Sequence, residues 1–223
     1  HRAAPGALVA IGMTLVIATA GIDLSVGAVM AMAGAVAALL LARPNPPPVP
    51  GVVLAGLAVA LAAGLWNGLL VACLRIQPII ATLVLMVAGR GIAQLLTDGQ
   101  IIVFENPAFE AIGTGSILGL PSTIWIYLGL LAVVLFLLRG TVAGLYIAAA
   151  GGNETAAAMA GVPVGRTKLA AYGLCGIAAG IAGLIATADI KAADANNVGL
   201  YLELDAILAV VIGGTPLAGE CCS

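Results

Sequence analysis

One stretch decides the fold: AIGMTLVIATAGIDLSVGAVMAMAGAVAALLLA, residues 10–42, which is almost wholly apolar yet carries a carboxylate, Asp23. The apolar run begins near residue 3. As one straight helix it would be about 60 Å long at about 1.5 Å per residue, whereas the core of a bilayer is about 30 Å thick. The run must therefore break, and GIDLS, residues 21–25, is where glycine and polar residues meet. We predict two legs, residues 3–20 and 25–42, which form a broken or re-entrant first segment.

The composition extends this reading to the whole chain. The 223 residues are 62% hydrophobic and 8% charged, whereas soluble domains are roughly half apolar and a quarter charged. We therefore predict an all-α, polytopic membrane helix bundle in contact with the lipid bilayer. The net charge of −2 and the absence of a basic run in the sequence exclude nucleic acid as a partner.

Further membrane spans are expected wherever about 20 apolar residues follow one another. These are residues 52–73, 78–96, 122–138 and 168–188. The last apolar stretch, residues 204–218, is short for a span and is expected to be re-entrant or a span cut by the chain end. The prolines of PNPPPVP, residues 44–50, cannot continue a helix, so they predict a loop outside the membrane.

Charge distribution orients the bundle. Residues 97–121 contain three acids and no base, whereas residues 139–167 contain Arg139 and Arg166. Basic loops stay on the cytoplasmic side, so we predict a cytoplasmic loop at 139–167 and a periplasmic loop at 97–121. If residues 3–20 cross the membrane fully, the amino end lies outside; if they enter and return, it lies inside.

The sequence offers no enzyme site and no metal site. His1 is the only histidine, so a Ser-His-Asp triad and a histidine metal site are both excluded, and no catalytic residue is predicted. One enzymatic alternative is an intramembrane aspartyl protease that pairs Asp23 with Asp205. Another alternative is a secondary transporter, which would use intramembrane ionisable residues such as Asp23 and Arg90 for ion coupling.

Four stretches together resemble one family. They are GMTLVIATAGIDLSVGAVMAMAGAVAA (12–38), RIQPIIATLVLMVAGRGIAQLLTDGQ (75–100), AAAGGNETAAAMAGVPVGRTKLAAYGLCGIAAGIAGLI (148–185) and ELDAILAVVIGGTPLAG (203–219). The chain resembles the permease subunit of bacterial monosaccharide ABC importers of the ribose type, which are related to branched-chain amino-acid permeases. Within that family, residues 77–101 and 188–214 look most like the galactofuranose permeases.

The resemblance implies a non-enzymatic transport subunit in the bacterial inner (plasma) membrane. A monosaccharide is the expected substrate, with galactofuranose first and ribose, xylose or galactose as alternatives. The implied partners are an ATP-binding subunit, a periplasmic sugar-binding protein and a second permease subunit, in a homo- or heterodimer. The sequence holds no G-x-x-x-x-G-K-[ST] loop, so no cofactor is expected and ATP is assigned to the partner. Residues 1–223 are expected to be one transmembrane permease domain, incomplete at both ends, and thus a fragment of a larger permease.

The resemblance also implies that the 139–167 loop is a coupling loop, in which residues 151–161 form a helix that docks on the ATP-binding subunit. The sequence suits a short helix, because Asn153 can cap it, Glu154 lies at the positive end of its dipole and Gly161 can stop it. An ordinary capped loop helix is the alternative. The candidate coupling residues are Gly151, Gly152, Asn153, Glu154, Ala157 and Gly161.

Asp23 has two interpretations. A carboxylate in an apolar span normally faces protein or a watery cavity, which makes a functional role the first hypothesis. We favour a structural role, in which Asp23 and Ser25 accept hydrogen bonds from amides freed by the break and cap the second leg.

Polar side chains inside spans are the candidates for contact with a sugar, which needs hydrogen-bonding partners without permanent charge. Thr82 could instead bond its own helix, Gln77 could lie at the interface, and Arg90 could pair with Asp98 or a backbone carbonyl. Asn196 and Asn197 could border the entrance or form a turn, and the turn is favoured. The candidate translocation path therefore consists of Asp23, Ser25, Asn67, Gln77, Thr82 and Gln94.

Overall fold

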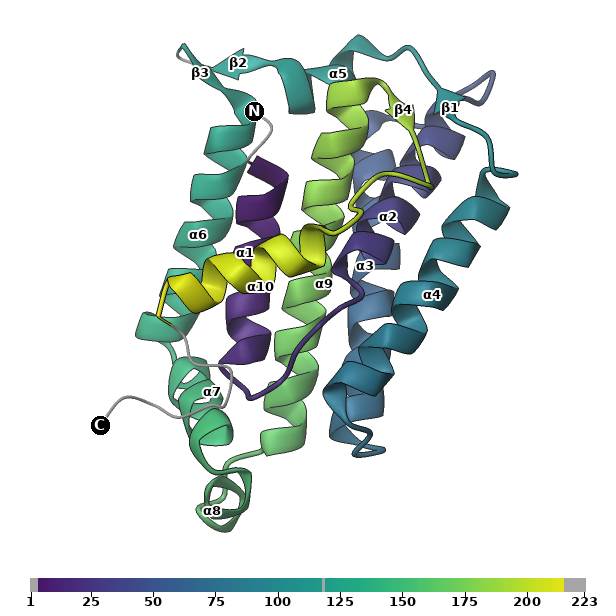
Figure 1. The fold of residues 1–223 in the computed structure, drawn as a ribbon. Coiled ribbons are helices and arrows are strands. Elements are labelled where there is room, and N and C mark those ends of the chain that lie inside the picture. Colours follow the sequence, from purple (N-terminus) through teal and green to yellow (C-terminus); the bar gives the residue numbers. More distant parts are fainter. Residues whose placement is uncertain (1–3, 118, 215–223) are drawn as a thin grey trace.

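The first apolar run is broken, as predicted, in the computed structural model, which describes residues 4–117 and 119–214. Helices α1 (Ala4–Ile17) and α2 (Val26–Leu41) contain 14 and 16 residues. At about 1.5 Å per residue each is shorter than a bilayer core. Between them Ala20 adopts a left-handed φ of 57°, and the chain climbs from the end of α1 to the start of α2 (Figure 1). We call residues 18–25 the joint.

Four long apolar helices match the predicted spans, with ends that differ by at most four residues. Prolines lie in the first turns of the two helices that begin at Val49 and Pro78, where a missing backbone N–H costs nothing. The structure confirms an all-α bundle, because each strand in the described residues has only two residues. The long helices are α3 (Val49–Ala72), α4 (Pro78–Leu96), α6 (Ser122–Gly140) and α9 (Val164–Ile190).

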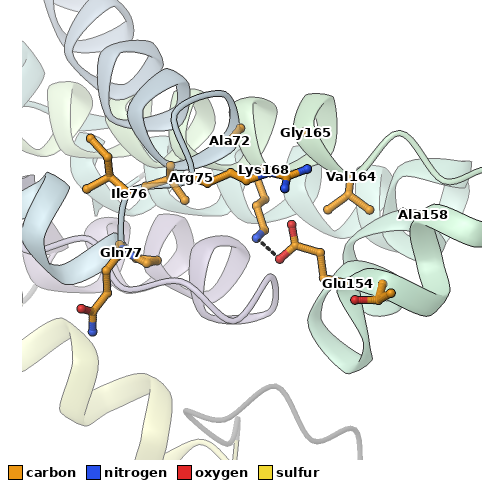
Figure 2. Close-up of a pocket in the computed structure, with 12 residues that line it drawn as sticks. Ala72, Arg75, Ile76, Gln77, Glu154, Ala158, Val164, Gly165 and Lys168 are labelled. Atoms are coloured by element: carbon orange, nitrogen blue, oxygen red, sulfur yellow. Dashed lines mark hydrogen bonds and ion pairs between the residues drawn. The ribbon is translucent and has the colours of Figure 1, made fainter.

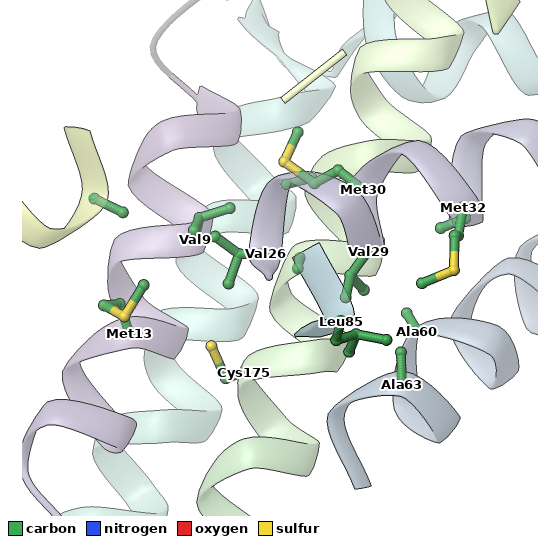
Figure 3. Close-up of a cluster of buried hydrophobic side chains, with 14 of the residues drawn as sticks. Val9, Met13, Val26, Val29, Met30, Met32, Ala60, Ala63, Leu85 and Cys175 are labelled. Atoms are coloured by element: carbon green, nitrogen blue, oxygen red, sulfur yellow. The ribbon is translucent and has the colours of Figure 1, made fainter. Parts of the chain in front are cut away.

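Helix α9 is the centre of the bundle and packs against α1, α2 and α3. Small residues permit its close approach to α3: a Cβ atom added to Gly176 would lie 2.5 Å from the carbonyl oxygen of Ala60 and 3.0 Å from the Cα of Gly64. In lipid, where burial adds little, such close packing is what holds helices together. Figure 3 shows the core beside this contact, with side chains from α1, α2, α3, α4 and α9 in one cluster.

Short elements gather at one end of the bundle, at the top of Figure 1. Strand β1 (Ile102–Val103) pairs antiparallel with β4 (Ala192–Ala193), so the 97–121 segment meets the chain that leaves α9. The remaining short elements there are α5 (Pro107–Thr114), β2 (Ser116–Ile117) and β3 (Leu120–Pro121). The charge rule predicts that this end faces outward, and we call it the outer end and the opposite end the inner end.

The opposite, inner end carries α7 (Val142–Gly152) and α8 (Glu154–Met159). Helix α1 connects the two ends. Pro5, near its start, lines a small cavity with Asp189 at the outer end, whereas the carbonyl of Ala18 after its last turn faces Gly151 of α7. The start of α1 therefore lies at the same end of the bundle as the 97–121 segment, and on which side of the membrane that end lies stays a prediction of the charge rule.

Helix α10 (Leu202–Ile212) lies obliquely across α1 (Figure 1). Its 11 residues are too few for a span. The prediction for residues 204–218 extends past the described residues at 215–218, so the structure addresses only its first part.

An ion pair links α5 to the end of α9 at the outer end, since the ammonium of Lys191 lies 2.7 Å from the carboxylate of Glu110. This hydrogen bond holds the pKa of Glu110 below its usual range, and the same bond raises the pKa of Lys191. A lowered carboxyl pKa adds stability above the unfolded value of about 4.3, and that stability is lost as the pH falls through the folded pKa. A raised lysine pKa adds stability that is lost only as the pH rises through the folded-state pKa of Lys191.

We therefore expect Lys191→Met to lower the Tm in detergent slightly at pH 7, and the difference from wild type to shrink below about pH 4.3. Lys191→Arg, which keeps the cation, is the control and should behave as wild type. A Tm difference that is the same at pH 7 and pH 3.5 would show that the ion pair is not its source.

Candidate functional site

A buried polar cluster ties the joint to α3. One oxygen of Asp23, Oδ1, accepts hydrogen bonds from the backbone amide of Ser25 at 2.9 Å and from its hydroxyl at 2.6 Å. The amide nitrogen of Asn67, on α3, donates to the Ser25 hydroxyl at 2.8 Å and reaches Asp23 Oδ1 at 3.4 Å. The three side chains are at most 1% exposed. The break is therefore held by hydrogen bonds between the joint, which supplies the carboxylate of Asp23, and α3, which supplies the amide of Asn67.

The prediction for Ser25 is wrong in one respect. Its hydroxyl was expected to help cap α2, but the side chain of Ser25 makes no capping hydrogen bond. The reason is that this hydroxyl already donates to Asp23 and accepts from Asn67. The other half of the prediction is confirmed, because Asp23 accepts from an amide freed by the break.

Thr82 lies beside the joint but chiefly bonds its own helix. Its hydroxyl is 2.9 Å from the carbonyl oxygen of Pro78 and 3.4 Å from that of Ile22. With an exposure of 0%, it joins Asp23, Ser25 and Asn67 in a closed junction among the joint, α3 and α4. Contact of these side chains with a sugar remains a prediction, because in this conformation they are buried.

Gln94 and Arg90 bind the loop that follows α9. The Gln94 amide donates to Asn196 at 2.8 Å, and the Arg90 guanidinium donates to the carbonyl oxygens of Ala195 and Val198 at 3.0 and 2.7 Å. Of the two predicted partners of Arg90, the backbone carbonyl is therefore the one found. The α9–α10 loop is thus fastened to the outer half of α4.

Asp194 makes that loop a turn. Its carboxylate accepts from the backbone amides of Asn196 and Asn197 and from the side chain of Asn197. The last of these bonds does most to lower the pKa of Asp194. Asn196 and Asn197 thus form a turn, the favoured alternative, at the outer end.

The predicted coupling segment contains a short helix. The side chain of Asn153 caps α8 by accepting from the amide of Ala156 at 2.9 Å, Glu154 lies in the first turn, and Gly161 follows the helix with a φ of 85°. Ala157 is 5% exposed and packs in one cluster with buried residues of α7 and α9. The local geometry expected from the sequence is confirmed, and the docking role stays a prediction.

An ion pair that the sequence does not predict joins α8 to the central helix. The ammonium of Lys168, on α9, lies 2.6 Å from the carboxylate of Glu154. The two residues are 14 positions apart in the chain and on different helices, so helical spacing gives no signal for the pair. Gly151 supports the same corner, since the carbonyl of Ala18 leaves no room there for a side chain, whereas a Cβ at Gly152 would meet no atom.

A groove of about 710 Å³ opens at the inner end between the α3–α4 turn and α8 (Figure 2). Gln77 lines this groove and is exposed, so it is not part of the buried cluster at the joint, and its place on the translocation path stays a prediction. The lining residues come from four helices and the turn: Val71, Ala72, Arg75, Ile76, Gln77, Pro78, Glu154, Thr155, Ala158, Val164, Gly165 and Lys168.

Comparisons with known proteins cover almost the whole chain. The family described as "Branched-chain amino acid transport system / permease component" matches residues 1–222. The chain is 55% identical to the galactofuranose transporter permease protein YtfT of Escherichia coli (strain K12), over 98% of this chain and 64% of the relative. It is 45% identical to the fructose import permease protein FruF of Bifidobacterium longum, over 95% of this chain and 60% of the relative.

A third relative, the ribose import permease protein RbsC of Haemophilus influenzae, is 43% identical over 96% of this chain and 66% of its own length. The chain thus spans about 60 to 66% of the length of these relatives. No solved structure matches it significantly.

Proposed function

Because this chain belongs to the permease component family of branched-chain amino acid transport systems, we propose that it is the membrane-spanning subunit of an ATP-driven importer for a monosaccharide. It is a multi-pass membrane protein, and we place it in the bacterial inner membrane. The observation that carries the proposal is the capped helix α8 at the inner end, joined to the central helix by Glu154 and Lys168. The intramembrane protease is not supported by any relative named above.

The geometry suggests how ATP hydrolysis would drive transport. Helix α8 packs on α7 and α9 and is tied to α9 by the ion pair. Helix α9 in turn packs against α1, α2 and α3. A push on α8 by the ATP-binding subunit would therefore reach the helices that hold the joint. In this scheme ATP stays on the partner, and this chain needs no cofactor.

Sugar would enter at the outer end, delivered by a periplasmic binding protein to the surface around α5 and the β1–β4 ribbon. A second permease subunit would complete the path. Galactofuranose is the first candidate substrate because the relative with 55% identity is a galactofuranose transporter permease. Ribose and fructose, for which the other two relatives are named, and xylose or galactose, are the alternatives.

A charge exchange tests the coupling role of α8. We expect Glu154→Lys to place two cations together at Lys168 and to reduce co-purification of the ATP-binding subunit at least tenfold, with loss of sugar-stimulated ATPase activity. Glu154→Gln, which removes the charge without repulsion, should have a smaller effect.

The double variant Glu154→Lys with Lys168→Glu restores the ion pair in reverse. Recovery of both co-purification and ATPase activity would show that the ion pair positions α8. A variant that folds but does not co-purify the ATP-binding subunit would show that this partner contacts Glu154 itself. A secondary transporter would keep its uptake in all three variants, and that result would contradict the proposal.

A further inference from the structure

Arg75 occupies a backbone position that suits glycine. It lies in the α3–α4 turn with a left-handed φ of 52°, a conformation that costs every side chain except glycine's. The turn is closed by hydrogen bonds from the backbone amide of Leu74 to the carbonyl oxygen of Leu69 and from that of Ile76 to Leu70. Arg75 is therefore a position at which glycine can replace the side chain without backbone strain.

Arg75 is also the unmatched charge of the inner groove. The groove holds two cations and one acid, Arg75, Lys168 and Glu154. Lys168 is paired with Glu154, whereas among the described residues nothing forms an ion pair or hydrogen bond with exposed Arg75. The groove, which residues of α8 also line, therefore presents one free guanidinium (Figure 2).

Exposed apolar side chains flank the groove on both sides. Leu74, before Arg75, is 61% exposed, and Met159, at the end of α8, is 84% exposed. Arginine and methionine are enriched in protein interfaces, in which apolar contacts surround a few polar anchors. The combination fits a protein partner that covers both the turn and α8.

We propose that this groove binds a segment of the ATP-binding subunit and that Arg75 receives an acidic side chain of that segment. The inference deepens the proposed function and rests on it. A guanidinium matches a carboxylate with two parallel hydrogen bonds, and a groove of about 710 Å³ has room for several side chains. The α3–α4 turn is thus a second docking contact beside the coupling helix.

Arg75→Gly is the sharpest test, because glycine favours the backbone conformation and removes only the side chain. The complex of the chain with the ATP-binding subunit of the same importer is reconstituted in nanodiscs of phosphatidylcholine alone and of phosphatidylcholine with phosphatidylglycerol. We expect Arg75→Gly to weaken binding of the ATP-binding subunit at least tenfold in both. Arg75→Glu should weaken it further, and added salt should narrow the difference from wild type.

Arg139→Glu is the matched control, because Arg139 is exposed, basic and at the same end of the bundle but outside the groove. The affinity of this variant for the ATP-binding subunit should stay within twofold of the wild-type value. Equal binding by wild type and both Arg75 variants would overturn the inference and leave the proposed function standing. A loss that occurs only with phosphatidylglycerol would also overturn it and assign Arg75 to a lipid headgroup. Failure of the wild-type chain to bind any ATP-binding subunit would refute the proposed function itself.

Discussion

Replacing Gly176 by leucine is expected to prevent the bundle from folding to a stable, monodisperse protein, with a loss above about 3 kcal/mol. Any Cβ at this position would meet the carbonyl oxygen of Ala60 at 2.5 Å and the Cα of Gly64 at 3.0 Å. Both are backbone atoms, so no side chain can rotate away and α3 must separate from α9. Because α9 also supports α1 and α2, the separation would spread through the core.

The control for Gly176 is another helical glycine. A Cβ at Gly129, an exposed residue of α6, would meet no atom within 4 Å, so Gly129→Leu should leave the stability unchanged or raise it by about 0.5–1 kcal/mol through helix propensity. The Gly176→Leu and Gly129→Leu variants are compared by size-exclusion chromatography and thermal unfolding in the same detergent. Similar behaviour of both variants would show that the α3–α9 contact is not the tight one that the structure describes.

Replacing Asn67 by leucine is expected to lower the free energy of unfolding by about 2 kcal/mol. The change removes the amide that donates to Ser25 and Asp23 and leaves the carboxylate of Asp23 with fewer donors at 1% exposure. An underpaired buried charge is costly wherever water cannot reach it. The joint should therefore loosen before the rest of the bundle does.

Trp66 provides the control, since it precedes Asn67 on α3 but is 55% exposed. Unfolding in a graded mixture of mild and denaturing detergent should show a change for Asn67→Leu and little change for Trp66→Leu. Equal losses in the two variants would mean that the polar cluster does not hold the joint.

Features with a local cause could be predicted from the sequence. A run twice as long as the bilayer is thick must break, and glycine with polar neighbours marks the place, so a break near residues 21–25 could be predicted. The cap by Asn153 and the stop at Gly161 likewise depend only on adjacent residues. The span ends followed to within four residues from length and proline position.

Long-range pairs could not be predicted, because they depend on how helices are rotated against one another. Asn67 is 44 positions from Asp23, and only the packing of α3 beside the joint brings them together. The same holds for Glu154 with Lys168. The error at Ser25 has this cause: a distant amide competes for the hydroxyl that local rules assign to capping.

Gln77 illustrates the limit for a transport path. A polar residue beside an apolar run can line a transport path or lie at the membrane boundary. The sequence pattern is the same in both cases, so it does not distinguish them. The structure puts Gln77 in the inner groove and Gln94 at the outer loop, at opposite ends of α4. Contact with sugar therefore remains a prediction for each candidate residue and needs transport data.

The most direct test of the account is uptake of labelled galactofuranose by cells that lack their own sugar permeases and express the full-length reading frame containing this chain, with its ATP-binding subunit and binding protein. We predict uptake that requires ATP and that excess ribose does not compete away. Uptake of ribose instead would keep the importer class and change the substrate. The absence of ATP-dependent uptake of any of the candidate sugars, in a complex shown to be assembled, would contradict the account.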